Sequence, residues 1–236
     1  GVELSLVIPC WNEARGLPTL VDRCAEVFGG REGVELVLVD NGSTDDTPRL
    51  MAELLAPLPW ARSVRVPENR GYGHGILTGL RTARGRVIGW THADLQTDPA
   101  DALRGLECFG RARDAERLLV KGRRYGRPAF DVVFTWGMAA FESVLLRAPL
   151  WDINAQPTLF PRSFFETWED PPTDFSLDLY AYWKAKRDGF EIERFPVHFG
   201  PRAFGASTWN TGLQARWRFI RRTVDYSLKL AREKGR

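Results

Sequence analysis

Short apolar runs alternate with helical patterns through the first half of the chain. Residues 4–9 and 34–39 are mostly apolar, rich in Val, Ile and Leu, and each run is followed by turn-forming residues. Between them, apolar residues recur at helical spacing as far as Phe28, just before a Gly-Gly pair. Apolar runs of this length predict strands that are buried on both faces. We expect further strands over 63–66, 86–90 and 118–121, and helices from Thr47, over 75–83 and from Pro99.

This order of elements predicts an α/β fold with a mostly parallel sheet and helices on both of its faces. Ligands of such sheets bind in a crevice at the carboxyl ends of the strands. Several polar residues follow predicted strands at this edge, namely Asp40, His92, Asp94 and Lys121. We therefore expect one crevice to collect their side chains.

The pattern changes after Arg127. We expect helices over 130–147, 176–187 and 211–232, and strands over 157–160 and 191–195. The last of these helices is amphipathic, because its apolar residues fall on one stripe and Arg and Lys cover the rest. No low-complexity linker separates the two patterns, so residues 1–127 and 128–236 are interpreted as two halves of one continuous domain.

Composition and charge narrow the class of protein. The 236 residues carry a net charge of only +3 at pH 7, which argues against a general nucleic-acid-binding protein. Three isolated cysteines indicate reduced thiols, and with them a cytoplasmic location. The first residues lack a basic leader, and no apolar run reaches about 20 residues, so we expect neither a signal peptide nor a transmembrane helix. Any contact with a membrane is expected to be peripheral.

The segment THADLQTDP, residues 91–99, is the leading candidate for a metal site. His92, Asp94 and Gln96 alternate, so in an extended segment their side chains point the same way. Oxygen ligands from Asp and Gln suit Mg²⁺ or Mn²⁺, and an imidazole favours Mn²⁺. A divalent cation here would bridge diphosphate oxygens. The alternative is an acidic loop that only caps the helix starting near Pro99, and the segment alone does not decide between the two.

Each of the other candidate residues allows two interpretations, a role in binding and a role in a turn or a solvated loop. Asp40 and Glu13 follow strands and can accept hydrogen bonds from a base or ribose, but both residue types are also common in turns. A basic cluster near the fifth strand suits a phosphate, although a solvated loop is the commoner role for such a run. This cluster comprises Lys121, Arg123, Arg124 and Arg127. No GxSxG context or zincin spacing occurs, which leaves covalent hydrolysis unsupported.

Four segments together resemble a known family. They are LSLVIPCWNE (4–13), VLVDNGSTDDT (37–47), NRGYGHGILTGLRTARGRVIGWTHADLQTDP (69–99) and VKGRRYGR (120–127). In this combination they are similar to family 2 glycosyltransferases with the GT-A fold, above all to the branch that acts on dolichyl or polyprenyl phosphate. The resemblance implies an inverting transfer from a GDP- or UDP-sugar to a polyprenyl phosphate, assisted by Mg²⁺ or Mn²⁺. The first half would then bind the donor and the second half the acceptor.

The resemblance also implies roles for single residues. Those expected to contact the donor are Pro9, Trp11, Glu13, Asp40, Ala93, Asp94, Arg202 and Ser207. Asp94 and Gln96 would hold the metal, and Arg124 with Arg127 would bind the acceptor phosphate. Asp94 and Arg124 would thus be the catalytic centre. The basic amphipathic helix 211–232 and the helix 130–147 would lie on the inner face of a membrane, unless both simply pack into the core.

Two positions depart from the family pattern. His92 stands where the family has the first Asp of its metal motif, so its role as a ligand stays open, and Thr208 stands where a Lys is expected. These departures leave two further hypotheses. In the first, the acceptor is a saccharide hydroxyl, with Asp178 or Asp174 as the general base. In the second, the chain is a nucleotide-sugar-binding protein without catalytic activity.

Overall fold

The computed structural model describes residues 1–126, 129–147, 149–204 and 213–233. Their centre is a seven-stranded sheet with the strand order β3-β2-β1-β4-β6-β5-β7. Its strands are β1 (Leu4–Cys10), β2 (Val34–Asn41), β3 (Ala61–Val66), β4 (Val87–Trp90), β5 (Leu118–Tyr125), β6 (Thr158–Pro161) and β7 (Glu191–His198). Only β6 runs antiparallel to its neighbours β4 and β5, so the sheet is mostly parallel.

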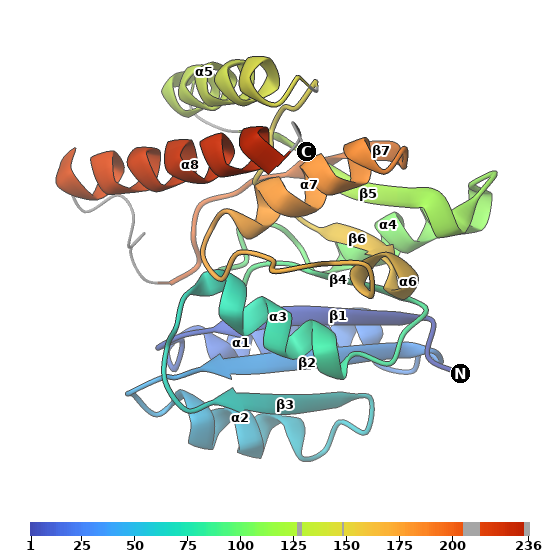
Figure 1. The fold of residues 1–236 in the computed structure, drawn as a ribbon. Coiled ribbons are helices and arrows are strands. Elements are labelled where there is room, and N and C mark those ends of the chain that lie inside the picture. Colours follow the sequence, from blue (N-terminus) through green and yellow to red (C-terminus); the bar gives the residue numbers. More distant parts are fainter. Residues whose placement is uncertain (127–128, 148, 205–212, 234–236) are drawn as a thin grey trace.

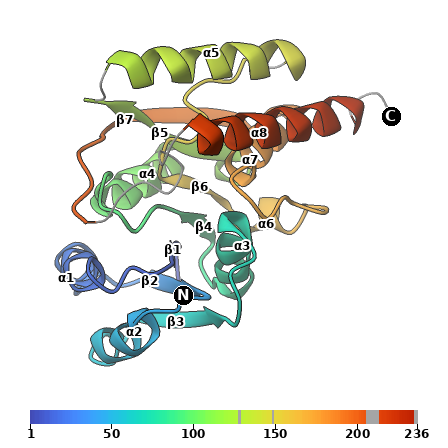
Figure 2. The ribbon, with the colours of Figure 1, turned by 90° about the vertical axis from the view of Figure 1, so that its left-hand side faces the viewer.

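Helices cover both faces of the sheet (Figures 1 and 2). On one face lie α1 (Leu17–Phe28), α2 (Thr47–Leu55) and α4 (Ala100–Arg111). On the other lie α3 (Tyr72–Thr82), the short α6 (Arg162–Phe165) and α7 (Leu177–Arg187). Two long helices, α5 (Ala129–Leu145) and α8 (Leu213–Glu233), form an outer layer above α7, at the end of the molecule remote from β3 (Figure 1). A 3₁₀ turn, η1 (Ala115–Arg117), precedes β5.

The alternation of side chains along β1 divides the core between the two faces. Leu4, Leu6 and Ile8 belong to the cluster that α1, α2 and α4 cover, whereas Val7 belongs to the cluster beneath α3 and α7. All four side chains are fully buried. Because both faces are packed at the centre of the sheet, β1 and β4 are apolar at nearly every position. The prediction of an α/β fold with helices on both faces is confirmed.

One strand differs from its prediction in a way that matters for the site. We expected the fifth strand to end at Lys121, but β5 continues to Tyr125 and pairs with β7 over its whole length. Lys121 therefore lies in the middle of the strand, with its side chain fully buried, and does not open into the crevice. The strand extends because its second half, although charged, gains parallel pairing with β7.

The outer layer encloses a buried carboxyl group. Glu142 of α5 is fully buried, and neither of its carboxyl oxygens has a hydrogen-bond partner among the described residues. It lines a small cavity of about 70 Å³ between α5, the start of α7 and Thr223 of α8. Burial raises the pKa of Glu142 from 4.5 to about 7, because an apolar cavity disfavours the charged form.

In the described part of the chain, no helix has the length and apolarity needed to cross a membrane.

The raised pKa of Glu142 predicts a pH-dependent stability. Between about pH 4.5 and 7 the folded protein keeps a proton that the unfolded chain has lost, so the free energy of unfolding falls as the pH rises. The loss amounts to at most about 1.4 kcal/mol per pH unit in this window. We expect Glu142→Gln to weaken this dependence and to raise stability at pH 8, as measured by urea unfolding from pH 4.5 to 8.

The control is Glu107→Gln, which changes an exposed carboxylate on α4. It should leave the pH dependence as it is in the parent protein. Equal pH profiles for Glu142→Gln and the parent protein would contradict the account of this carboxyl group.

Candidate active site

The main cavity lies where the strand order reverses. β1 pairs with β2 on one side and with β4 on the other, and the segments that follow β1 and β4 diverge at this point. The cavity has a volume of about 530 Å³. Its lining comprises Pro9, Cys10, Trp11, Asn12, Glu13, Asn41, Asn69, Gly71, Tyr72, His92, Ala93, Asp94, Phe175, Arg202 and Phe204.

The segment after β4 turns sharply so that Asp94 faces the cavity. Leu95 has a positive φ of 57°, and Asp94 Oδ1 accepts a hydrogen bond of 3.1 Å from the backbone N–H of Gln96. The other carboxylate oxygen, Oδ2, lies 3.2 Å from Nη2 of Arg202. Asp94 is 9% exposed, so this carboxylate is held in place yet can still be reached from the cavity.

The loop after β7 is fastened to the same turn. The backbone N–H of Gly200 donates to the carbonyl of Gln96 at 2.8 Å, and the Gln96 side-chain amide donates to the Gly200 carbonyl at 3.1 Å. This pair of bonds brings Arg202 to the cavity although it lies more than a hundred residues away from Asp94 in the sequence. The donation uses the Gln96 nitrogen, so its amide oxygen remains as an acceptor.

His92 is engaged by a partner that the sequence did not suggest. Its Nε2 lies 2.7 Å from the hydroxyl of Tyr72, which also stacks on Phe175 with ring centroids 4.6 Å apart. Burial lowers the pKa of His92, so the ring is neutral near pH 7. Burial, followed by the negative charge of Asp178, raises the pKa of Tyr72, and the phenol therefore keeps its proton.

The residues at this turn fit a divalent cation that takes part of its ligands from the protein and the rest from a substrate. Asp94 supplies a carboxylate and Gln96 an amide oxygen, which are the hard ligands that Mg²⁺ and Mn²⁺ accept. Glu13 lines the same cavity, and burial, followed by the charge of Asp94, raises the pKa of its carboxyl group. Among the described residues no group of three or more His, Cys, Asp and Glu could enclose a metal by itself. A cation would need further ligands from a diphosphate.

The end of β2 presents unsatisfied acceptors. Asp40 is 2% exposed, and its Oδ1 accepts a hydrogen bond of 3.0 Å from the backbone N–H of Ser43. Its Oδ2 lies 3.3 Å from Nε of Arg65 but has no hydrogen-bond partner among the described residues. The next residue, Asn41, lines the cavity, and its Oδ1 has no partner among the described residues. Sequence reasoning missed Asn41, because in the run DNGST it reads as a turn residue.

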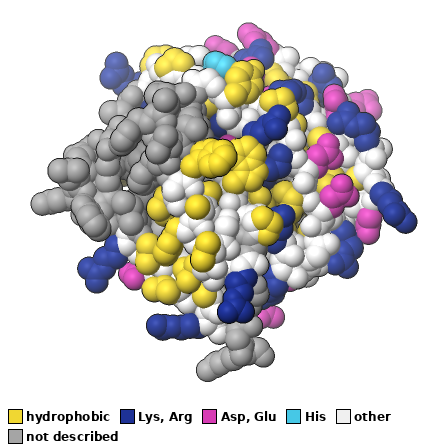
Figure 3. Space-filling model, turned by 90° about the horizontal axis from the view of Figure 1, so that it is seen from above, with side chains coloured by type: hydrophobic (Ala, Val, Ile, Leu, Met, Phe, Trp, Pro, Cys, Tyr) yellow, Lys and Arg dark blue, Asp and Glu magenta, His cyan; other side chains and the backbone are white. Residues whose placement is uncertain are grey.

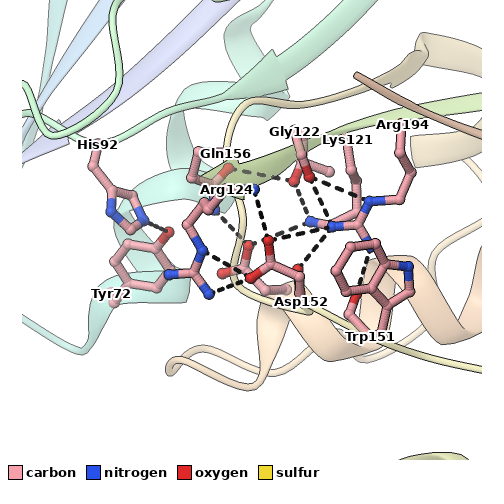
Figure 4. Close-up of polar contacts among 11 residues, drawn as sticks. Tyr72, His92, Lys121, Gly122, Arg124, Trp151, Asp152, Gln156 and Arg194 are labelled. Carbon is pink, nitrogen blue, oxygen red and sulfur yellow. Dashed lines mark hydrogen bonds and ion pairs between the residues drawn. The ribbon is translucent and has the colours of Figure 1, made fainter. Parts of the chain in front are cut away.

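The predicted acceptor residue Arg124 is already paired. Its Nε donates to Oδ1 of Asp152 at 2.8 Å, and its backbone N–H donates to Oδ2 at 2.9 Å. Arg194 lies on the other side of Asp152, at 4.0 Å, and its guanidinium stacks on Trp151. Figure 4 shows Arg124 and Asp152 between the Tyr72–His92 pair and Arg194. Arg124 also lies near enough to His92 for its charge to lower the pKa of that ring.

A second buried group lies beside this cluster. Asp178, at the start of α7, is 2% exposed and accepts a 2.6 Å hydrogen bond from the Gln156 side chain. Lys121 lies 3.9 Å from Asp178 and donates to the hydroxyl of Thr158 at 2.6 Å. Burial lowers the pKa of Lys121 to about 7. These residues form a polar layer behind the cavity wall.

The structure thus gathers most of the predicted site. Pro9, Trp11, Glu13, His92, Ala93, Asp94 and Arg202 all line one cavity. Gln96 lies in the adjoining turn, whereas Asp40, Arg124 and Asp178 are not among the lining residues. Arg127, Ser207 and Thr208 lie outside the described residues. The roles predicted for all of these residues stay predictions.

A cavity at this point of such a sheet is typical of the GT-A fold of glycosyltransferases. The structure is similar to that of glucosyl-3-phosphoglycerate synthase from Mycobacterium tuberculosis in complex with UDP. That comparison has a TM-score of 0.72 at 20% identity and covers 98% of this chain and 80% of the synthase. A mannosyltransferase from Pyrobaculum calidifontis in complex with GDP-Man and Mn²⁺ gives a TM-score of 0.65 at 23% identity, over 93% of this chain and 60% of that one.

The family follows from the sequence comparison. The protein-family model described as Glycosyl transferase family 2 matches residues 5–167, which is more than half of the chain. The chain therefore belongs to this family. Glycosyltransferase AglD of Haloferax volcanii is 28% identical over 86% of this chain and 34% of its own length. Dodecaprenyl-phosphate galacturonate synthase of Rhizobium johnstonii is 39% identical over 42% of this chain and 30% of its own length. The chain therefore spans about a third of the length of these relatives.

The buried pairing of Asp152 predicts a large loss of stability when this residue is removed. Asp152→Ala leaves the cations of Arg124 and Arg194 without their shared carboxylate, and a broken buried ion pair costs about 3–5 kcal/mol. Urea unfolding at pH 7 measures this loss. Asp170→Ala changes a carboxylate whose side chain is 93% exposed and whose φ of 44° equals that of Asp152, so it measures the backbone strain alone and should cost at most about 1 kcal/mol. A loss below about 1 kcal/mol for Asp152→Ala would contradict the assigned pairing.

Proposed function

We propose that the protein transfers a sugar from a nucleotide diphosphate to the phosphate of a polyprenyl lipid, with inversion at the anomeric carbon. The observation that carries this proposal is the single cavity in which Asp94 and Arg202 face each other. It lies at the sheet edge where donors bind, beside the buried cluster around Arg124. Relatives whose names specify polyprenyl-phosphate acceptors support the choice of acceptor.

The donor would occupy the cavity along the ends of β1, β2 and β4. Trp11 and Asn41 line its walls and would enclose the base. Asp94 and Gln96 would hold the divalent cation, which would neutralise the diphosphate as it leaves. The guanidinium of Arg202 would donate hydrogen bonds to the same diphosphate.

In the reaction, an oxygen of the acceptor phosphate forms a bond to the anomeric carbon while the bond from that carbon to the donor diphosphate breaks. A phosphate monoester has a second pKa of about 6, so its oxygen is already anionic at pH 7 and needs no general base. What it needs is alignment with the sugar and a counter-charge. The guanidinium of Arg124 would provide both, sharing its donors between Asp152 and the phosphate.

The surroundings of Asp178 and Asp174 support a phosphate acceptor over a hydroxyl acceptor. A general base must come within hydrogen-bond reach of the proton that it removes. Asp178 is buried and held by Gln156, and the carboxylate of Asp174 accepts a 2.9 Å bond from the backbone N–H of Ser176. Asp178 is only 2% exposed, whereas the side chain of Arg124 is 12% exposed. We therefore assign Asp178 to the polar layer behind the site.

The reaction is tested with purified protein, UDP- and GDP-sugars, a short polyprenyl phosphate, and either Mn²⁺ or Mg²⁺. We expect one donor to yield a glycosylated lipid phosphate, with the product lost on addition of EDTA. Asp94→Ala should lower the rate at least a hundredfold, because it removes the charged ligand of the cation. Product formation with Asp94→Ala at the parental rate would rule out this site, and a failure of every donor would favour the binding-protein hypothesis.

Asp178→Asn distinguishes the two acceptor classes. If Asp178 is the base for a hydroxyl acceptor, this variant loses turnover by a factor of about 10² or more while it still binds the donor. In our account it weakens folding and leaves kcat for the lipid phosphate within about tenfold of the parent protein. A thermal unfolding curve of the variant provides the control for folding.

The outer layer carries features of a membrane-facing surface. Figure 3 shows hydrophobic side chains gathered on the face that α5 and α8 cover, bordered by Lys and Arg. On α5, Trp136 is 67% and Val144 is 80% exposed, and Leu228 of α8 is 39% exposed. Apolar side chains rimmed by cations suit an interface with anionic lipid. We propose that this surface holds the protein at the membrane that contains its acceptor.

Vesicle sedimentation tests this surface. Trp136→Ser, and separately Arg221→Gln with Arg222→Gln, should each lower the fraction bound to vesicles of anionic phospholipid. The double variant should lower the binding constant at least tenfold, because each basic residue near such a surface contributes about 1 kcal/mol. The charge-matched control, Arg31→Gln with Arg81→Gln, changes exposed cations on other elements and should bind like the parent protein. Equal losses in both double variants would contradict the assignment.

A further inference from the structure

Arg202 takes a position at Asp94 that a cation would otherwise occupy. Its Nη2 lies 3.2 Å from Oδ2 of Asp94, the carboxylate oxygen that the turn at Gln96 leaves unused. Of the described residues that line the cavity, Arg202 is the only Arg or Lys. The guanidinium is therefore the counter-charge that Asp94 has in this structure.

The single positive charge of Arg202 cannot offset both the charge of Asp94 and that of a bound diphosphate. In this structure the guanidinium offsets the charge of Asp94, and a second carboxyl group, that of Glu13, lines the same cavity. A bound diphosphate adds further negative charge next to both carboxylates. If the guanidinium turns to the diphosphate, Asp94 loses its partner in a partly buried place, which is costly unless another cation replaces it.

The way in which Arg202 is held allows such an exchange. Its loop is fastened through Gly200, which exchanges hydrogen bonds with Gln96, and through the backbone N–H of Ala203, which donates to the Asp94 carbonyl at 3.4 Å. These bonds involve the backbone next to Arg202 and not its side chain. The side chain is 29% exposed, so its long stem can swing to a new partner while the loop stays in place.

We propose that Arg202 is an exchangeable placeholder, which neutralises Asp94 in the empty site and moves to the diphosphate when the divalent cation arrives with the donor. The proposal rests on the proposed function only in that the ligand is a cation with a nucleoside diphosphate. It predicts that a cation alone must compete with Arg202 for Asp94 and so binds weakly. Cation and nucleotide then bind cooperatively, each raising the affinity of the other by the same factor.

Mn²⁺ binding without any sugar transfer tests the proposal. The electron paramagnetic resonance signal of free Mn²⁺ gives the dissociation constant with and without UDP or GDP. In the absence of nucleotide, Arg202→Gln should bind Mn²⁺ about tenfold more tightly than the parent protein, because the competing charge is gone. The factor by which the nucleotide strengthens Mn²⁺ binding should fall correspondingly in the variant.

Three further variants make the outcome specific. Arg70→Gln removes an equal charge from a neighbouring exposed residue that does not line the cavity, and should leave the affinity for Mn²⁺ alone unchanged. Arg202→Lys keeps the competing charge and should resemble the parent protein. Asp94→Asn, combined with Arg202→Gln, should cancel the gain in affinity. Thermal unfolding of each variant establishes that it is folded.

The proposal is overturned if Arg202→Gln binds Mn²⁺ no more tightly than the parent protein, including the case in which neither binds it detectably. It is also overturned if Arg70→Gln gives the same gain, since the effect would then be one of general charge. Tighter Mn²⁺ binding by Arg202→Gln in a protein that transfers no sugar would sustain the placeholder and refute the transfer reaction. Sugar transfer by the parent protein, without tighter Mn²⁺ binding by Arg202→Gln, would support the transfer reaction and refute the placeholder.

Discussion

The site depends on the reversal of strand order between β1 and β4. Parallel strands that diverge at this point leave a cavity at their carboxyl ends, because the segments that follow them leave the sheet in different directions. Asp94 and Glu13 reach this cavity from segments that are about eighty residues apart in the sequence. The apolar packing on both faces fixes the sheet, and so fixes the positions at which charged groups can meet.

Charge is distributed differently on the two sides of the cavity wall. On the open side, Asp94 and Arg202 form a pair that solvent and ligands can reach. Behind the wall, Asp152 pairs with both Arg124 and Arg194, and the three side chains are nearly excluded from water. Buried pairs of this kind are costly to break, whereas the partly exposed pair can exchange partners. In the proposed reaction, the rigid cluster would hold one phosphate still, and the adaptable pair would follow the departing diphosphate.

The sequence allowed the fold and about half of the cavity lining to be predicted, because strand ends can be recognised from apolar runs followed by polar turns. The cavity formed by the ends of β1 and β4 follows directly from that reading. Pairings between side chains that are distant in the sequence could not be predicted from the sequence. The hydroxyl of Tyr72, twenty residues before His92, and the carboxylate of Asp152, held against Arg124, depend on how helices and loops pack. The continuation of β5 beyond Lys121 was missed because its charged second half is ordered by pairing with β7, which no local pattern encodes.

The central claim is that this cavity binds a nucleoside diphosphate through a divalent cation at Asp94. Isothermal titration calorimetry of the parent protein with UDP and GDP, in Mn²⁺ and in EDTA, tests it most directly. The account predicts that one nucleotide binds in Mn²⁺ and loses at least tenfold in affinity in EDTA, whereas its nucleoside, which has no phosphates, responds little to the cation. Equal affinities with and without Mn²⁺, or no binding of either nucleotide, would contradict it.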